Sequence, residues 1–123
     1  PRLITWAEQG RAALGDQPML AAARLTGLRL TGAHGQALAE ARSLAARYPG
    51  QAVFASHRAW NALRLRELAE AEAAAIDATR AAPREQGAWA LLATIWRITG
   101  DPRGAWLLDH DRLVMVADLA TPR

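Results

Sequence analysis

The order of apolar and polar residues along the chain is typical of helices. Strong helix formers, led by Ala, Leu, Arg and Glu, dominate the sequence, and no strand-like alternation of apolar and polar positions interrupts them. Short turn segments divide it, so we expect helices joined by links of two to four residues, which make neighbouring helices antiparallel. The expected helices cover residues 2–14, 18–31, 34–48, 52–65, 68–81, 86–99 and 102–109.

Several features recur at a constant spacing of about 34 residues, which predicts a helical repeat. Pro49 and Pro83 each end an Ala-rich stretch, because the residue before a proline is pushed out of the α conformation. Gly32 and Gly100 stand where the first helix of a unit should end, a position that favours glycine. The recurring series are Gly32, Arg66 and Gly100, and Ala37, Ala71 and Ala105. The expected units, of two helices each, are about residues 18–51, 52–85 and 86–109.

The third unit carries a family motif, made of Trp89, Leu92, Ala93 and Trp96, then Gly100 and Ala105. It resembles the tetratricopeptide repeat (TPR), which has Trp, Leu, a small residue and a large aromatic at this spacing. The first two units depart from it, with Ala21 and Ala55 replacing the aromatic and Arg24 and Arg58 replacing the leucine. The resemblance covers about residues 18–109. It implies an all-α fold, an α-solenoid of about three TPR-like helix-turn-helix repeats with an extra N-terminal helix.

The end of the chain follows no repeat. Residues 109–112 are polar and residues 113–116 form a short apolar run, which is not the polar capping helix expected after a last repeat. Residues 96–119 resemble the junction in bacterial TPR proteins that continue into a 2-oxoglutarate/iron(II) oxygenase domain. Because the chain also begins with Pro1, we expect residues 1–123 to be a single TPR-like domain, with a tail at 110–123, from a longer protein.

Composition and charge exclude several classes of protein. There are 30 alanines and no cysteine, and all 15 basic residues are arginine, so the pI near 10.9 reflects arginine while the net charge is only +3. The arginines are interleaved with 12 acidic residues rather than clustered, so we expect no nucleic-acid partner. No apolar run is long enough to cross a bilayer and no signal pattern opens the chain. We therefore expect no membrane partner and a cytoplasmic location.

Candidate chemistry is sparse. Oxygenases of the kind named above bind iron through a His-x-Asp pair and a second histidine, but Asp111 follows His110 directly and Arg112 occupies the place of the carboxylate. We expect His34 and His110 to be solvated. The same holds for the carboxylates along the fifth expected helix, Glu67, Glu70 and Glu72. No serine lies in a Gly-x-Ser-x-Gly turn. We expect no enzymatic activity in this chain, no cofactor and no metal.

The tryptophans divide into predicted core residues and one candidate for a binding surface. Trp89 and Trp96 are two helical turns apart on one face, which is typical of core, whereas Trp60 has Thr26 and Thr94 as its counterparts in the other units. In TPR stacks the first helices line a concave groove where ligands bind. The resemblance places the following residues along it: Thr26, Arg29, His57, Trp60, Arg64, Thr94 and Arg97. They are either ordinary solvated residues or a peptide-binding site. A third interpretation is an apolar patch of Val53, Trp60 and Leu63 covered by a second copy or a missing domain.

Two functions are compatible with these features. The first is a scaffold that binds a protein or peptide in its groove, and an acidic partner with a large apolar side chain would match Trp60 and its arginines. The alternative is a non-catalytic arm of a 2-oxoglutarate/iron(II) oxygenase that recruits substrate or forms a homodimer. The family alone does not decide between them, because TPR proteins bind many kinds of ligand.

Overall fold

The structure is a computed structural model that describes residues 4–5 and 18–109, and in these ranges its regular secondary structure is entirely helical. The helices confirm six of the expected ones to within one residue at each end. The expected helix at 2–14 lies outside the described residues except for Ile4 and Thr5, which are helical, and the tail at 110–123 lies outside them entirely. The helices are α2 (Pro18–Leu30), α3 (His34–Arg47), α4 (Ala52–Arg64), α5 (Leu68–Ala81), α6 (Gln86–Thr99) and α7 (Arg103–Asp109).

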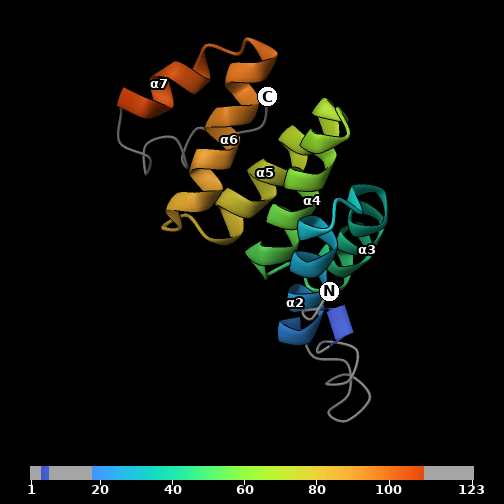
Figure 1. The fold of residues 1–123 in the computed structure, drawn as a ribbon. Helices are drawn as coiled ribbons and strands as arrows, with labels where there is room; N and C mark the ends of the chain where they lie inside the picture. Colours follow the sequence, from blue (N-terminus) through green and yellow to red (C-terminus); the bar gives the residue numbers. More distant parts are fainter. Residues whose placement is uncertain (1–3, 6–17, 110–123) are drawn as a thin grey trace.

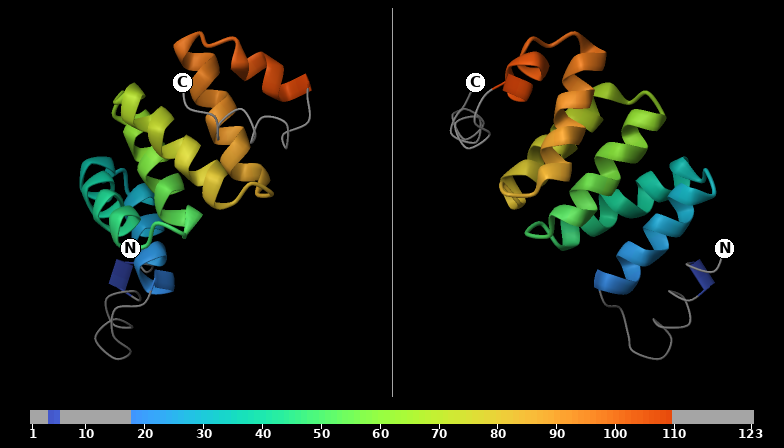
Figure 2. Two further views of the ribbon diagram at one scale, coloured as in Figure 1. Left: turned by 180° about the vertical axis from the view of Figure 1, so that it is seen from behind. Right: turned by 60° about the vertical axis from the view of Figure 1, so that its left-hand side comes forward.

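The six helices pack against one another in chain order (Figures 1 and 2). Each contacts the next, because the links between them are short. Helix α4 also contacts both α2 and α6, so the first helices of the three expected units are neighbours in space. Side chains from α2, α4 and α6 can therefore meet on one side of the molecule.

The same turn follows each of these first helices. Gly32, Arg66 and Gly100, which occupy the same place in successive units, have φ angles of 80°, 62° and 77°. In each turn the next residue donates its backbone N–H to the carbonyl five positions earlier, as Glu67 does to Ala62 at 2.8 Å. This is the Schellman cap, which needs one residue in the left-handed conformation. The cap therefore recurs at the spacing that the sequence predicts, even where arginine replaces glycine.

Arg66→Gly should stabilise the protein. A non-glycine residue in the left-handed conformation carries a steric cost of about 1–2 kcal/mol, which the greater backbone freedom of glycine in the unfolded chain partly offsets. We expect a net gain of about 0.5–1 kcal/mol in the free energy of unfolding, measured by urea denaturation. Gly100→Ala is the matched control and should lower stability. If Arg66→Gly is less stable than the wild type, the Arg66 side chain stabilises the folded state by more than the backbone strain destabilises it.

Trp89 and Trp96 are core residues, as predicted, with 2% and 0% of their surfaces exposed. They pack with small residues of α4 and α5 and with Leu107 of α7. The Trp89 indole N–H donates to the carbonyl of Pro83 at 2.8 Å, and the Arg103 guanidinium lies over the Trp96 ring, 4.3 Å from its centroid. The aromatic pair thus ties α6 to the turn before it and to the helix after it.

The alanine series of the repeat does not keep the same burial in its third member. Ala37 and Ala71 are fully buried, but Ala105 is exposed and the buried small residue of α7 is Gly104. A Cβ at Gly104 would lie 3.1 Å from the backbone nitrogen of Arg97, so only glycine fits this approach to α6 without a shift.

Candidate functional site

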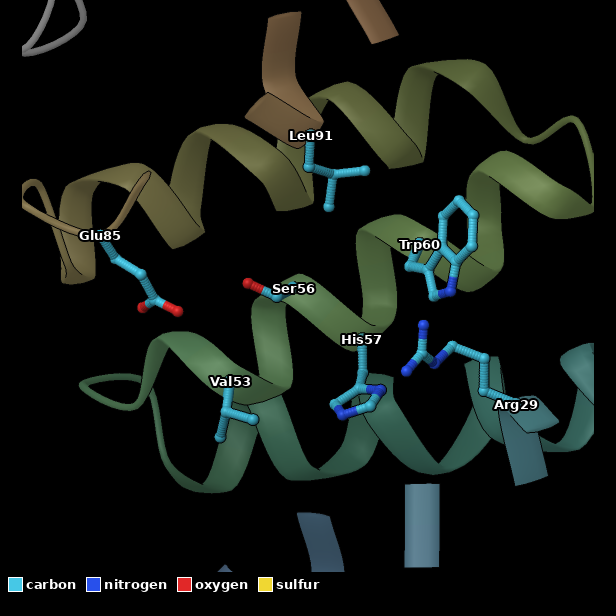
Figure 3. Close-up of a pocket in the computed structure, with 7 residues that line it drawn as sticks. All are labelled: Arg29, Val53, Ser56, His57, Trp60, Glu85 and Leu91. Carbon is cyan, nitrogen blue, oxygen red and sulfur yellow. The ribbon is translucent and has the colours of Figure 1, made fainter. Parts of the chain in front are cut away.

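A pocket of about 250 Å³ lies where α2, α4 and α6 meet (Figure 3). Pockets for whole small-molecule ligands are typically about 300–1,000 Å³, so this slightly smaller one is large enough for one amino-acid side chain. Three of the seven predicted site residues, Arg29, His57 and Trp60, line it together. The complete lining is Arg29, Val53, Ser56, His57, Trp60, Glu85 and Leu91.

Two arginines lie over the ring of Trp60. The guanidinium carbons of Arg29 and Arg64 are 5.9 and 5.6 Å from the ring centroid, within the range of a cation–π interaction. Arg64 is not part of the pocket lining but extends the cationic edge beyond it. The indole Nε1 of Trp60 and the Nε of Arg29 are buried and have no hydrogen-bond partner among the described residues. Among the described residues, the Trp60 ring therefore contacts the core cluster and two guanidinium groups, with no hydrogen bond at its Nε1.

The arginines at the pocket differ from several others in the fold. Elsewhere arginines are neutralised by ion pairs with carboxylates: Arg24 with Glu40, Arg42 and Arg58 with Glu70, and Arg103 with Asp101. Within the described part of the chain, neither Arg29 nor Arg64 has a carboxylate at ion-pair distance. Their positive charge is uncompensated, which favours an anionic group on a ligand.

His57 is a neutral side chain at neutral pH. Burial, and then the positive charge of Arg29, lower the pKa of His57 from its ordinary value of 6.5 to about 4. Figure 3 shows the Arg29 guanidinium between the His57 ring and the Trp60 indole. The two basic side chains can lie this close because only Arg29 carries a charge.

The lowered pKa of His57 predicts a loss of stability in mild acid. The unfolded chain takes up a proton near pH 6.5 and the folded chain only near pH 4, so the contribution is complete above pH 6.5 and falls between these values. We expect a loss of about 3 kcal/mol in the free energy of unfolding from pH 7 to pH 4. Denaturant titrations at several pH values measure it. His57→Gln should flatten the curve in this window, and an unchanged curve would contradict the assignment.

The opposite end of the pocket carries a negative charge. Glu85, the residue before α6, is exposed and lies across the pocket from Arg29 (Figure 3). Its carboxylate is near the N-terminus of α6, a favourable place for a negative charge. Val53 and Leu91 provide apolar surface in the same pocket. The pocket therefore has a cationic end, an acidic end and an apolar wall.

Three lining residues, Ser56, Glu85 and Leu91, were not predicted from the sequence. Leu91 could have been found, because it stands one repeat length after His57 and so occupies the same place in the next unit. Glu85 immediately precedes α6. The groove was predicted only from residues within the first helix of each unit, so Glu85 was not considered. Ser56 is adjacent to His57 on α4, and no spacing distinguished it.

The remaining predicted site residues do not line the pocket. The hydroxyls of Thr26 and Thr94 donate to carbonyls one turn earlier in their own helices, at 3.1 and 2.8 Å. Arg97 is exposed, and its stem lies beside Gly104. Leu63 is 6% exposed and belongs to the core, so the apolar patch proposed for Val53, Trp60 and Leu63 is wrong in that member.

His34 is not simply solvated, as expected from the sequence, but half-buried at the start of α3. Its Nδ1 lies 3.1 Å from the side-chain oxygen of Asn61, which is fully buried. The amide nitrogen of Asn61 donates to the backbone carbonyl of His57 at 2.7 Å. This connection supports the turn of α4 that carries His57 and Trp60. The burial of Asn61 was not predicted from the sequence.

Glu70 also departs from the expected solvated face. It accepts hydrogen bonds from the Nε of Arg42 on α3 at 2.7 Å and from the Nε of Arg58 on α4 at 2.9 Å. The hydrogen bond from Arg42, together with the bond from Arg58 and both positive charges, lowers the pKa of Glu70 to about 2. Glu72 lies 3.7 Å from Arg103, whereas Glu67 is exposed as expected. One carboxylate of α5 therefore joins three helices.

Glu70→Gln should lower the free energy of unfolding by about 1 kcal/mol at pH 7, since a hydrogen-bonded network with Arg contributes more than an isolated surface pair. Because the pKa of Glu70 is lowered from 4.5 to about 2, its contribution is complete above pH 4.5 and is lost as the pH falls through 2. Acid titration of the variant, followed by circular dichroism, should show a weaker dependence in this window. If the stability of the variant depends on pH as strongly as that of the wild type, the contact of Glu70 with Arg42 and Arg58 does not stabilise the fold.

The described residues offer neither a metal site nor a membrane span. In the part of the chain that the structure describes, no three His, Asp or Glu residues lie together as a metal site. Among the helices described there, none combines the length and the apolar character needed to cross a bilayer. His110 and Asp111 lie outside the described residues, as does part of the segment 96–119 on which the oxygenase resemblance rests.

Comparison with known proteins gives no relative. The chain matches no family model, no curated protein sequence and no solved structure. The geometry of the pocket is therefore the main guide to function.

Proposed function

We propose that the chain is a peptide-binding scaffold of the TPR type, and that its pocket takes one apolar side chain of a partner segment beside an acidic residue. The observation that carries the proposal is Trp60 at a pocket of side-chain size, with the guanidinium groups of Arg29 and Arg64 over its ring. Trp and Arg are the residue types most enriched in binding hot spots.

The repeat supports the assignment to the TPR type. The Schellman caps at Gly32, Arg66 and Gly100 recur once in each unit. Their spacing agrees with the length of a TPR unit, which is about 34 residues. The contacts of α4 with α2 and α6 agree with first helices stacked side by side along a groove. The pocket lies among these three helices, where ligands bind in such stacks.

The chemistry of the pocket favours a peptide over other ligands. Its volume suits one side chain, and its apolar members, Val53, Trp60 and Leu91, suit an aliphatic or aromatic one. The two arginines without carboxylate partners suit an acidic residue next to it. A nucleic acid fits less well, because the arginines of the ion pairs described above are neutralised and are not available to phosphates.

Selection from a random heptapeptide library displayed on phage tests the proposal. On the wild-type chain we expect enrichment of sequences with a large apolar residue close to Asp or Glu. The enrichment should disappear on Trp60→Ala and weaken on Arg29→Gln. Arg97→Gln, which changes an exposed arginine outside the pocket, is the matched control and should select the same peptides. No enrichment, or the same enrichment on Trp60→Ala, would refute the proposal.

A further inference from the structure

We infer that the pocket selects a bound segment with two opposite charges: a basic residue at the Glu85 end, an apolar side chain in the middle and an acidic residue at the Arg29 end. The inference rests on the proposed function, which by itself requires only the apolar and acidic residues. It adds a third element of the ligand, and the residue that carries it is Glu85.

The charges at the two ends of the pocket are opposite and separate. Glu85 and Arg29 both line it, but no ion pair forms between them, and Figure 3 shows them across the pocket from each other. Within the described ranges, neither has an ion-pair partner of its own. A ligand that spans the pocket therefore meets an unpaired carboxylate at one end and an unpaired guanidinium at the other.

The surface between the charges has an apolar part, beside the uncharged polar side chains of Ser56 and His57. Val53 of α4 and Leu91 of α6 contribute aliphatic side chains, and the Trp60 ring lies next to Arg29. Since the pocket holds about one side chain, the flanking residues of an extended segment must lie over its ends. Residues two positions apart in an extended chain are on the same face and about 7 Å apart. The matching segment is thus basic-x-apolar-x-acidic, in either chain direction.

The other charged groups near the pocket do not cancel this pattern. Arg64 strengthens the cationic end, since it lies over the same indole ring as Arg29. His57 is neutral at neutral pH, because its pKa is lowered to about 4. An entirely acidic segment would place one carboxylate against Glu85, and an entirely basic one would place an ammonium against Arg29 and Arg64. A segment with one charge of each sign avoids both repulsions.

Three acetylated and amidated peptides test the inference: Lys-Ser-Leu-Ser-Glu, Glu-Ser-Leu-Ser-Glu and Lys-Ser-Leu-Ser-Lys. Binding is followed by NMR titration of the indole N–H resonance of Trp60, assigned with Trp60→Phe. On the wild-type chain the mixed peptide should bind about two- to fivefold more tightly than the acidic one, as expected for an exposed ion pair. The basic peptide should bind most weakly.

Glu85→Lys provides the decisive variant, since Glu85 is exposed and makes no side-chain capping bond. This variant should reverse the order, so that the acidic peptide binds more tightly than the mixed one. Glu85→Gln should make the two peptides bind equally.

If the acidic peptide binds at least as tightly as the mixed one to the wild type, and Glu85→Lys leaves the order unchanged, the inference is overturned while the proposed function stands. If no peptide shifts the Trp60 resonance, both fail.

Discussion

Replacing Trp96 by alanine is expected to lower the free energy of unfolding by about 3–5 kcal/mol, the usual loss when a large buried aromatic is removed. Trp96 has 0% of its surface exposed and packs in the main core cluster with Leu92 and Ile95 of its own helix and Leu107 of α7. Its loss would also leave the Arg103 guanidinium without the ring over which it lies. Urea denaturation followed by circular dichroism measures the effect.

Trp96→Phe is the control for this variant. The indole Nε1 of Trp96 is buried and has no hydrogen-bond partner among the described residues, so phenylalanine loses volume but no hydrogen bond. We expect the loss in the free energy of unfolding to be less than half as large in Trp96→Phe as in Trp96→Ala. A Trp96→Ala protein as stable as the wild type would show that α6 and α7 do not pack through this ring.

Trp60→Ala is expected to weaken peptide binding by about 2 kcal/mol or more, which is about 30-fold in affinity, if Trp60 is the hot spot of the pocket. The ring forms part of the apolar wall and carries two guanidinium groups over it, so its removal both opens the pocket and releases Arg29 and Arg64. Isothermal titration with a peptide recovered by display measures the change. Trp60 is only half-buried, so the variant should lose less stability than Trp96→Ala.

The two arginines should act mainly on the rate of association. Neutralising Arg29 and Arg64 together should slow association with an acidic peptide and reduce its dependence on salt, because charges at the edge of an interface steer the encounter. Neutralising Arg97 should change neither. For the Trp60→Ala prediction, the contradicting result is a folded variant that binds the peptide with the same affinity as the wild type. That result would show that the pocket is not the binding site.

The helices were predictable because local signals mark their ends. Pro49 and Pro83 each stand two residues after the last residue of a helix, and glycine marks two of the three left-handed caps. Residue type alone would not have predicted the left-handed cap at Arg66, since arginine rarely adopts positive φ. Only the constant spacing of the repeat placed the turn there. Ala105 shows the limit of spacing alone, because it keeps the spacing of the alanine series and yet is exposed, while its neighbour Gly104 is buried.

The candidate site was predictable only in part, because it depends on contacts between units. Arg29, His57 and Trp60 line one pocket because α2 contacts α4, although Arg29 is not at the repeat position of either of the other two. Long-range polar contacts have no such signature. The bond between His34 and Asn61 joins residues 27 positions apart, and the bridge from Arg42 to Glu70 spans 28 positions. No local pattern distinguishes such partners from solvated residues.

The central claim, that this pocket binds a peptide through Trp60, is tested most directly by mapping the bound surface. The measurement is a ¹H–¹⁵N NMR titration of the full chain with a display-selected peptide. The claim predicts saturable shifts at the Trp60 indole and at the amides of Val53, His57 and Leu91, which line the pocket. It also predicts unshifted amides at Ala105 and its neighbours in α7. Shifts confined to α7 or to the exposed end of α6 around Arg97, with the Trp60 indole unchanged, would contradict it.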